Sequence, residues 1–130
     1  MKAKETPIYA TTYQLAEMLL RVTRNFPRDL KPTLGQRIMD TSMNMILTIY
    51  RANAAREGRA ELVEKVLEDL QVIEMAIRLS SDQHLISRKQ HGQLIELTDS
   101  IGRQGYRWKQ DAQRRQAPRT STSKRYGQNV

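Results

Sequence analysis

The chain of 130 residues is long enough for one domain with a single hydrophobic core. Its apolar fraction of 38% and charged fraction of 28%, with only 5% aromatic residues, favour an all-α protein in solution. The lack of cysteine excludes a disulfide framework, and no apolar run approaches the roughly 18 residues that cross a membrane. The first ten residues also lack a signal-peptide core, so we expect a cytoplasmic location.

The formal charge of +8 is unevenly distributed along the chain. Residues 1–57 contain nine basic and five acidic side chains, and residues 83–130 contain ten and three. Residues 58–82 reverse the balance, with three basic and six acidic side chains. This asymmetry indicates an anionic partner that faces some parts of the molecule and not others.

The first predicted helix carries five apolar residues at helical spacing, which places them on one face: Leu15, Met18, Leu19, Val22 and Phe26. Pro27 marks its end. Thr33 stands three residues before Gln36, which is typical of a capping box at a helix start. We therefore predict a second helix from this point to about Glu57.

The second helix has two apolar stripes. The first predicts a core face and comprises Leu34, Ile38, Met45 and Ile49. The second comprises Met39, Met43, Ile46 and Tyr50. A helix that is apolar over most of its circumference is usually buried on more than one side. The second stripe therefore predicts either a deep core position or an oligomer surface.

Gly58 interrupts the pattern as a helix-ending glycine does. The third helix then shows core spacing at Leu62, Val66, Leu70, Ile73 and Ile77, while its outer face is acidic at Glu61, Glu64, Glu68 and Asp69. Ser87 and Gln90 form a second predicted capping box. It opens a fourth helix that directs four side chains toward the core: Leu94, Leu97, Ile101 and Trp108.

Short loops between four helices predict an antiparallel up-down-up-down four-helix bundle, with a three-helix bundle containing a broken element as the alternative. We assign residues 1–115 to the bundle. From residue 116 to 130 the sequence has neither apolar periodicity nor acidic residues, which predicts a disordered basic C-terminal tail.

Catalytic and metal-binding patterns are weak in this chain. There is no Glu-x-x-His pair of the kind that bundle metal sites use, and His84 and His91 have no third ligand nearby in the sequence. Gly102 and Gly105 lack the lysine and preceding strand of a phosphate loop, so they indicate close helix packing or a local bend. We expect no cofactor, no metal and no enzymatic activity.

Basic residues occupy outer faces of the first and fourth helices. Steps of three and seven align Arg21, Arg24 and Arg28 on one stripe of the first helix. The fourth helix repeats the arrangement with Arg103, Arg107 and Arg114, and Lys109 and Arg115 lie beside them. Solvation of a bundle surface explains such charges as well, but solubilising faces usually mix both signs. The one-sign stripes favour binding of nucleic acid through its phosphates and shape, without base-specific reading.

The stretch Thr6 to Gln110 resembles the accessory variability (Avd) proteins of diversity-generating retroelements. These lie within a wider family of bacterial four-helix-bundle proteins that includes those encoded in ribosomal RNA intervening sequences. The resemblance is carried by the segments NFPRDLKPTLGQRI (25–38), IYRAN (49–53) and LTDSIG (97–102), together with Trp108. The first segment is the most specific.

The resemblance implies a positively charged homopentameric barrel that associates with the element's reverse transcriptase and its template RNA during adenine-directed mutagenic copying. It also implies a nucleic-acid-binding role for Arg28, Lys31 and Arg37, which lie in or beside the first segment. The alternative, equally available, is that these residues stabilise the fold of this loop. The partners expected are the reverse transcriptase, RNA, and DNA or an RNA–DNA hybrid, with no membrane. The alternative is a structural oligomer or protein-interaction module of the intervening-sequence type.

Overall fold

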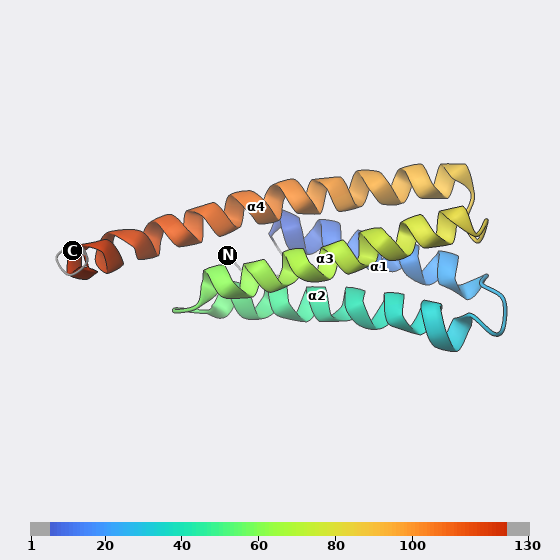
Figure 1. The fold of residues 1–130 in the computed structure, drawn as a ribbon, viewed down its shortest axis with the longest axis horizontal. Coiled ribbons are helices and arrows are strands. Elements are labelled where there is room, and N and C mark those ends of the chain that lie inside the picture. Colours follow the sequence, from blue (N-terminus) through green and yellow to red (C-terminus); the bar gives the residue numbers. More distant parts are fainter. Residues whose placement is uncertain (1–5, 125–130) are drawn as a thin grey trace.

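The computed structural model describes the backbone of residues 6–124 and the side chains of residues 6–116. This part of the chain forms four α-helices and no β-strand: α1 (Pro7–Arg24), α2 (Gln36–Ala54), α3 (Arg59–Asp82) and α4 (Arg88–Lys124). Each helix packs against two others, in the cyclic order α1, α2, α3, α4, and consecutive helices run antiparallel (Figure 1). The predicted up-down-up-down bundle is confirmed, and the three-helix alternative is wrong.

The core consists of the apolar faces that the spacing predicted. Leu15, Met45, Ile73 and Ile101, one from each helix, have no exposed side-chain surface. Burial of an aliphatic side chain of this size contributes about 1.5–3 kcal/mol, so these faces hold the four helices together. Four residues predicted for the core are only half-buried: Leu34, Leu62, Leu97 and Trp108.

The start of α4 is closed by the capping box predicted at Ser87 and Gln90. The Gln90 backbone N–H donates to Ser87 Oγ at 3.0 Å, and the Ser87 N–H donates to Gln90 Oε1 at 2.9 Å. The helix begins one residue after the cap, at Arg88. These reciprocal bonds satisfy two backbone donors that a helix start leaves without partners.

The capping box predicted at Thr33 is wrong. A π-helical turn, η2 (Lys31–Gly35), precedes α2, and its Gly35 N–H donates to Leu30 O at 2.9 Å. The chain is therefore already helical at Thr33, and no free helix end remains there to be capped. The Thr33 hydroxyl instead lies 3.3 Å from Leu30 O as a donor within the turn.

The corner between α2 and α3 is closed by a side chain. Gly58 adopts a left-handed conformation with φ of 73°, which a residue with a Cβ rarely adopts. Arg59 then reaches back, and its guanidinium donates to Ala52 O and Ala55 O at 2.8 Å each. These bonds satisfy carbonyl groups at the end of α2. They also explain why α2 stops at Ala54 and not near Glu57.

The backbone of α4 remains helical to Lys124, past the boundary predicted after Arg115. Ala112 is the last buried residue among the described side chains, and beyond it α4 projects past the other three helices (Figure 1). A formed helix gains a hydrogen bond for each added residue that has a backbone N–H, which favours continuation of its backbone. The remainder of the predicted tail, 125–130, lies outside the described residues.

Gly105 lies where α4 passes close to the Leu67 side chain of α3. A Cβ atom at this position would lie 2.8 Å from Leu67 Cδ2 and 3.7 Å from Ile8 Cδ1. The first distance is shorter than van der Waals contact allows. The prediction that this glycine serves close helix packing is therefore confirmed. Gly102 is looser, since a Cβ atom there would lie 3.6 Å from Leu70 Cδ2.

Candidate nucleic-acid interface

One end of the bundle carries exposed basic side chains on α1 and on the connection to α2. We call it the connection end and define it as residues 21–35 and 82–91. Arg21 and Arg24 lie in the last turn of α1, where positive charge also interacts favourably with the helix dipole. Arg28 and Lys31 follow in the connection, which the buried Phe26 anchors to the core.

The connection end also contains two basic residues that apolar and charge spacing did not single out. Arg88 and Lys89 open α4 and are exposed. The antiparallel arrangement brings the start of α4 to the same end of the bundle as the end of α1 (Figure 1). Arg88 and Lys89 directly follow the Ser87 cap in the sequence, and this position could have predicted that they lie at the connection end. Arg37, in the first turn of α2, is exposed as well.

The second basic stripe lies farther along the bundle. Gln104 Nε2 donates to Thr11 Oγ1 at 3.2 Å, which sets α4 residue 104 opposite α1 residue 11. At 1.5 Å per residue, Arg107 then lies roughly 24 Å along the bundle axis from Arg24. The two stripes therefore form separate groups on neighbouring helices and do not form one patch. We call the region with residues 6–11, 50–62 and 103–115 the pocket end.

Two of the predicted binding residues are engaged by carboxylates. Lys109 Nζ lies 2.5 Å from Glu64 Oε1 across the α3–α4 contact, and this hydrogen bond raises the pKa of Lys109. Arg114 forms an ion pair with Asp111 one turn earlier on α4. Lys109 is half-buried because it lies about half a turn around α4 from Arg107.

The other eight predicted basic side chains are exposed and form no ion pair within the described part of the chain: Arg21, Arg24, Arg28, Lys31, Arg37, Arg103, Arg107 and Arg115. Exposed guanidinium groups without acidic partners can hold two phosphate oxygens at once. The arrangement therefore retains most of its positive charge for an external anion.

The surface of α3 next to α4 has the opposite character. Burial raises the pKa of Glu74, and the nearby Asp99 carboxylate on α4 raises it further. Burial also raises the pKa of Asp69, against the opposing effect of Lys65. This cluster of carboxyl groups makes this side of the bundle less favourable for a polyanion than the faces that carry the exposed basic residues.

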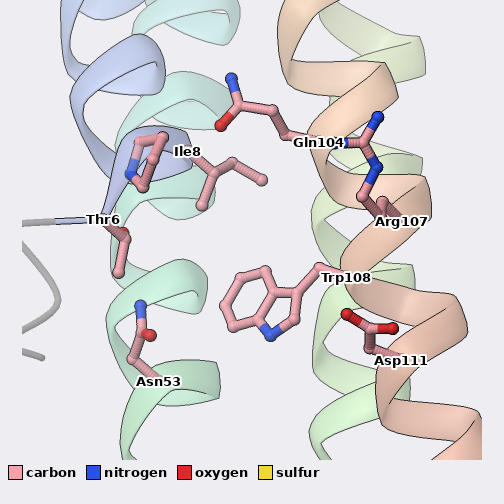
Figure 2. A pocket seen from close by; sticks show the side chains of 8 residues that line it. Thr6, Ile8, Asn53, Gln104, Arg107, Trp108 and Asp111 are labelled. Atoms are coloured by element: carbon pink, nitrogen blue, oxygen red, sulfur yellow. The ribbon is translucent and has the colours of Figure 1, made fainter.

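A pocket of about 290 Å³ opens at the pocket end, between the start of α1, the end of α2 and α4. The indole of Trp108 lies in the middle of it, with Ile8 and Asn53 to one side and Asp111 to the other (Figure 2). The remaining lining residues are Thr6, Pro7, Gln104 and Arg107. The prediction that Trp108 is a core residue missed this pocket, because helical spacing shows which way a side chain faces but not how fully its neighbours cover it.

The second apolar stripe of α2 is not part of the core. Met43 is 58% and Tyr50 is 59% exposed, while Met39 and Ile46 are half-buried. The deep-core alternative is therefore wrong. The oligomer-surface alternative stays a prediction, and we call these four residues the α2 apolar surface. Leu47, which belongs to neither predicted stripe, is 46% exposed beside them on the same helix.

The two histidines lie at the corner between α3 and α4 and not in a metal centre. His91 Nδ1 and Ser81 Oγ share a hydrogen bond of 3.3 Å across this corner, and His84 lies in the corner itself with φ of 60°. Within residues 6–124 no three His, Cys, Asp or Glu side chains come together as metal ligands. None of the described helices combines the length and apolarity needed to cross a bilayer.

The geometry thus defines a class of protein: an antiparallel four-helix bundle that presents basic side chains from neighbouring helices. A family model described as bAvd-like matches residues 8–112, which is most of the chain, and the chain belongs to that family. Membership suggests an accessory protein of a diversity-generating retroelement. No curated protein matches the chain.

Proposed function

We propose that this chain is a non-catalytic accessory subunit of a diversity-generating retroelement, which binds template RNA or cDNA through its basic surfaces and associates with the reverse transcriptase during mutagenic copying. Membership of the bAvd-like family supports the assignment to this class of element. The observation that carries nucleic-acid binding is the set of eight exposed basic side chains without acidic partners among the described residues.

The distance between the two basic groups suits an extended polyanion. Arg24 and Arg107 are separated by roughly 24 Å along the bundle axis, which corresponds to roughly seven base pairs of duplex at 3.4 Å each. A strand lying along α1 and α4 would therefore contact one group and then the other. Contacts of this kind recognise the phosphate backbone, and they predict little dependence on base sequence.

The α2 apolar surface would serve assembly. The exposed Met43 and Tyr50 side chains on one helix face favour contact with another protein surface, because their hydration is unfavourable. In our proposal this surface joins copies of the chain into a homo-oligomer, a pentamer by family resemblance. Assembly would multiply the basic groups available to one nucleic acid and so increase its overall affinity.

The binding proposal is tested by charge reversal. The variant with Arg21, Arg24, Arg103 and Arg107 all changed to Glu should lose binding to single-stranded RNA, measured by fluorescence anisotropy over a range of salt concentrations. The slope of log affinity against log salt should fall by about 0.7 for each phosphate contact removed from a single strand. Equal affinity before and after the reversal would overturn the proposal.

A matched control keeps the number of charge changes equal. The Arg21→Glu, Arg24→Glu double variant is compared with Lys65→Glu, Arg78→Glu, since both control residues are exposed on α3. Only the first pair should change the salt slope. Circular dichroism of all variants establishes that each remains helical, so that lost binding is not lost folding.

A second candidate function is a structural or protein-interaction module, and the exposed Met43 and Tyr50 favour it. The two functions differ in what the protein retains after purification. Under the second, a protein partner survives nuclease treatment and RNA is never bound. Under the first, RNA is bound directly by the purified chain, and the reverse transcriptase remains associated when both are expressed together.

A further inference from the structure

The pocket at the pocket end has one aromatic wall and one aliphatic wall. The Trp108 indole lies across from Ile8, and Figure 2 shows the indole ring face-on between the helices. A volume of about 290 Å³ is at the lower limit of ligand sites, which begin at about 300 Å³. The pocket therefore suits one flat ring system and not a large ligand.

The rim of the pocket presents hydrogen-bond acceptors, because the two amide side chains are held in fixed orientations. Thr11 Oγ1 donates to Pro7 O at 2.9 Å, so it can only accept from Gln104 Nε2. Asn53 Nδ2 donates to Ile49 O at 3.3 Å. Because a backbone carbonyl oxygen only accepts, the atom that faces it must be the amide nitrogen, and this fixes the orientation of the Asn53 amide. The carbonyl oxygens Gln104 Oε1 and Asn53 Oδ1 therefore remain as acceptors at the rim.

The charged residues of the pocket complement these acceptors. The Asp111 carboxylate is turned toward Trp108 in Figure 2 and is paired with Arg114, and its oxygens add further hydrogen-bond acceptors. Arg107 lies at the opening, exposed and without an acidic partner among the described residues, where it can contact a phosphate. An aromatic wall, several acceptors and one arginine at the opening match the parts of a nucleotide.

We infer that this pocket binds one unpaired, amino-bearing base of the nucleic acid, stacked on Trp108, while Arg107 contacts the adjoining phosphate. The exocyclic amino group of adenine, cytosine or guanine has two N–H donors, and it can donate to two of the acceptors that Asn53, Gln104 and Asp111 supply. Uracil has a carbonyl oxygen at the position of the cytosine amino group and keeps only its ring N3–H as a donor, so it offers these acceptors one hydrogen bond in place of two. This inference rests on the proposed nucleic-acid function and adds a preference among bases to it.

The single tryptophan of the chain makes a direct test possible. The full-length protein is titrated with oligocytidine and with oligouridine of equal length, and the fluorescence of Trp108 is followed. The two oligonucleotides have the same ring size and backbone and differ in the amino group. We expect oligocytidine to quench the fluorescence and to bind about tenfold more tightly than oligouridine, which is the effect of about one hydrogen bond to a charged or buried acceptor.

Three variants separate stacking from hydrogen bonding, with affinity measured by anisotropy of labelled RNA. Trp108→Leu should weaken oligocytidine binding by about tenfold or more, and Trp108→Tyr should restore part of it. Asn53→Leu should reduce the ratio of cytidine to uridine affinity while leaving the salt dependence unchanged. Tyr106→Leu is the control, since Tyr106 is exposed on the same helix and does not line the pocket.

The possible outcomes distinguish the inference from the function on which it rests. Equal, salt-dependent binding of both oligonucleotides with unchanged Trp108 fluorescence overturns the base pocket and leaves the proposed function intact. Absence of binding to any RNA overturns both. Quenching by an arginine-rich peptide but not by RNA also overturns the inference, because the pocket then receives a protein side chain.

Discussion

The connection end and the pocket end of the bundle carry the same kind of charge in different settings. At the connection end, Arg21 and Arg24 stand on open helix surface without an acidic partner among the described residues. At the pocket end, Lys109 and Arg114 are held by carboxylates, and Arg107 borders a shaped cavity. Free charge attracts any polyanion, whereas charge beside a shaped cavity can select among ligands.

The largest expected effect comes from reversing charge at each end separately. Arg21→Glu with Arg24→Glu, and Arg103→Glu with Arg107→Glu, should each weaken RNA binding by about 100-fold at low salt, because each removes two phosphate contacts and adds repulsion. Only the pocket-end pair should also reduce quenching of Trp108 at saturating oligocytidine. Identical fluorescence behaviour of the two pairs would remove the distinction between the ends.

The next effect concerns the folding of the pocket end. Arg59→Met should lower the free energy of unfolding by about 2 kcal/mol, since it leaves Ala52 O and Ala55 O without their charged donor. Urea denaturation measures the change. Arg56→Met is the matched control, because Arg56 is exposed and forms no hydrogen bond among the described residues, and its effect should be close to zero.

The connection end is tested in the same way through its helix cap. Ser87→Ala should cost about 1 kcal/mol of stability, because it removes the hydroxyl that accepts the Gln90 N–H. Thr33→Ala should cost less, since the Thr33 hydroxyl bonds within an existing helical turn and caps nothing. Thermal denaturation of the two variants compares them, and a greater loss with Thr33→Ala would contradict the assignment of caps.

The smallest effect lies at the acidic contact between α3 and α4. Burial and Asp99 raise the pKa of Glu74, so its ionised form is penalised in the folded state. Glu74→Gln should therefore stabilise the protein by about 0.5 kcal/mol at neutral pH. The gain should disappear as the pH falls through the raised pKa toward and below 4.5, where Glu74 itself is protonated. Denaturation at several pH values measures it, and a gain that persists at low pH would argue against this cause.

Most of the fold could be predicted because apolar spacing reports directly on burial. The five apolar residues whose spacing predicted the first helix, from Leu15 to Phe26, are all buried. The cap at Ser87 was also predictable, since both partners lie three residues apart in one local turn. The positions at which α2 begins and ends could not be predicted in this way. The π-helical turn decides where α2 begins, and the hydrogen bonds of Arg59 close its end. Both depend on three-dimensional geometry that residue type alone does not encode.

The candidate interface was predicted in part. Spacing identified which cationic residues lie on outer faces, and eight of them are exposed and without carboxylate partners in the described part. The pairing of Lys109 with Glu64 escaped prediction because it joins residues far apart in sequence across two helices. The pocket escaped for the same reason, since its walls come from α1, α2 and α4.

The Leu67 side chain of α3 can pack against α4 at Gly105 because residue 105 has no side chain. A methyl group there would displace the end of the Leu67 side chain on α3 and would come into ordinary van der Waals contact with Ile8 of α1, which is itself a wall of the pocket. Gly105→Ala would thus require the Leu67 side chain to move at the level where α1, α3 and α4 meet. The packing behind the Ile8 wall of the pocket depends in this way on the absence of a Cβ atom at residue 105.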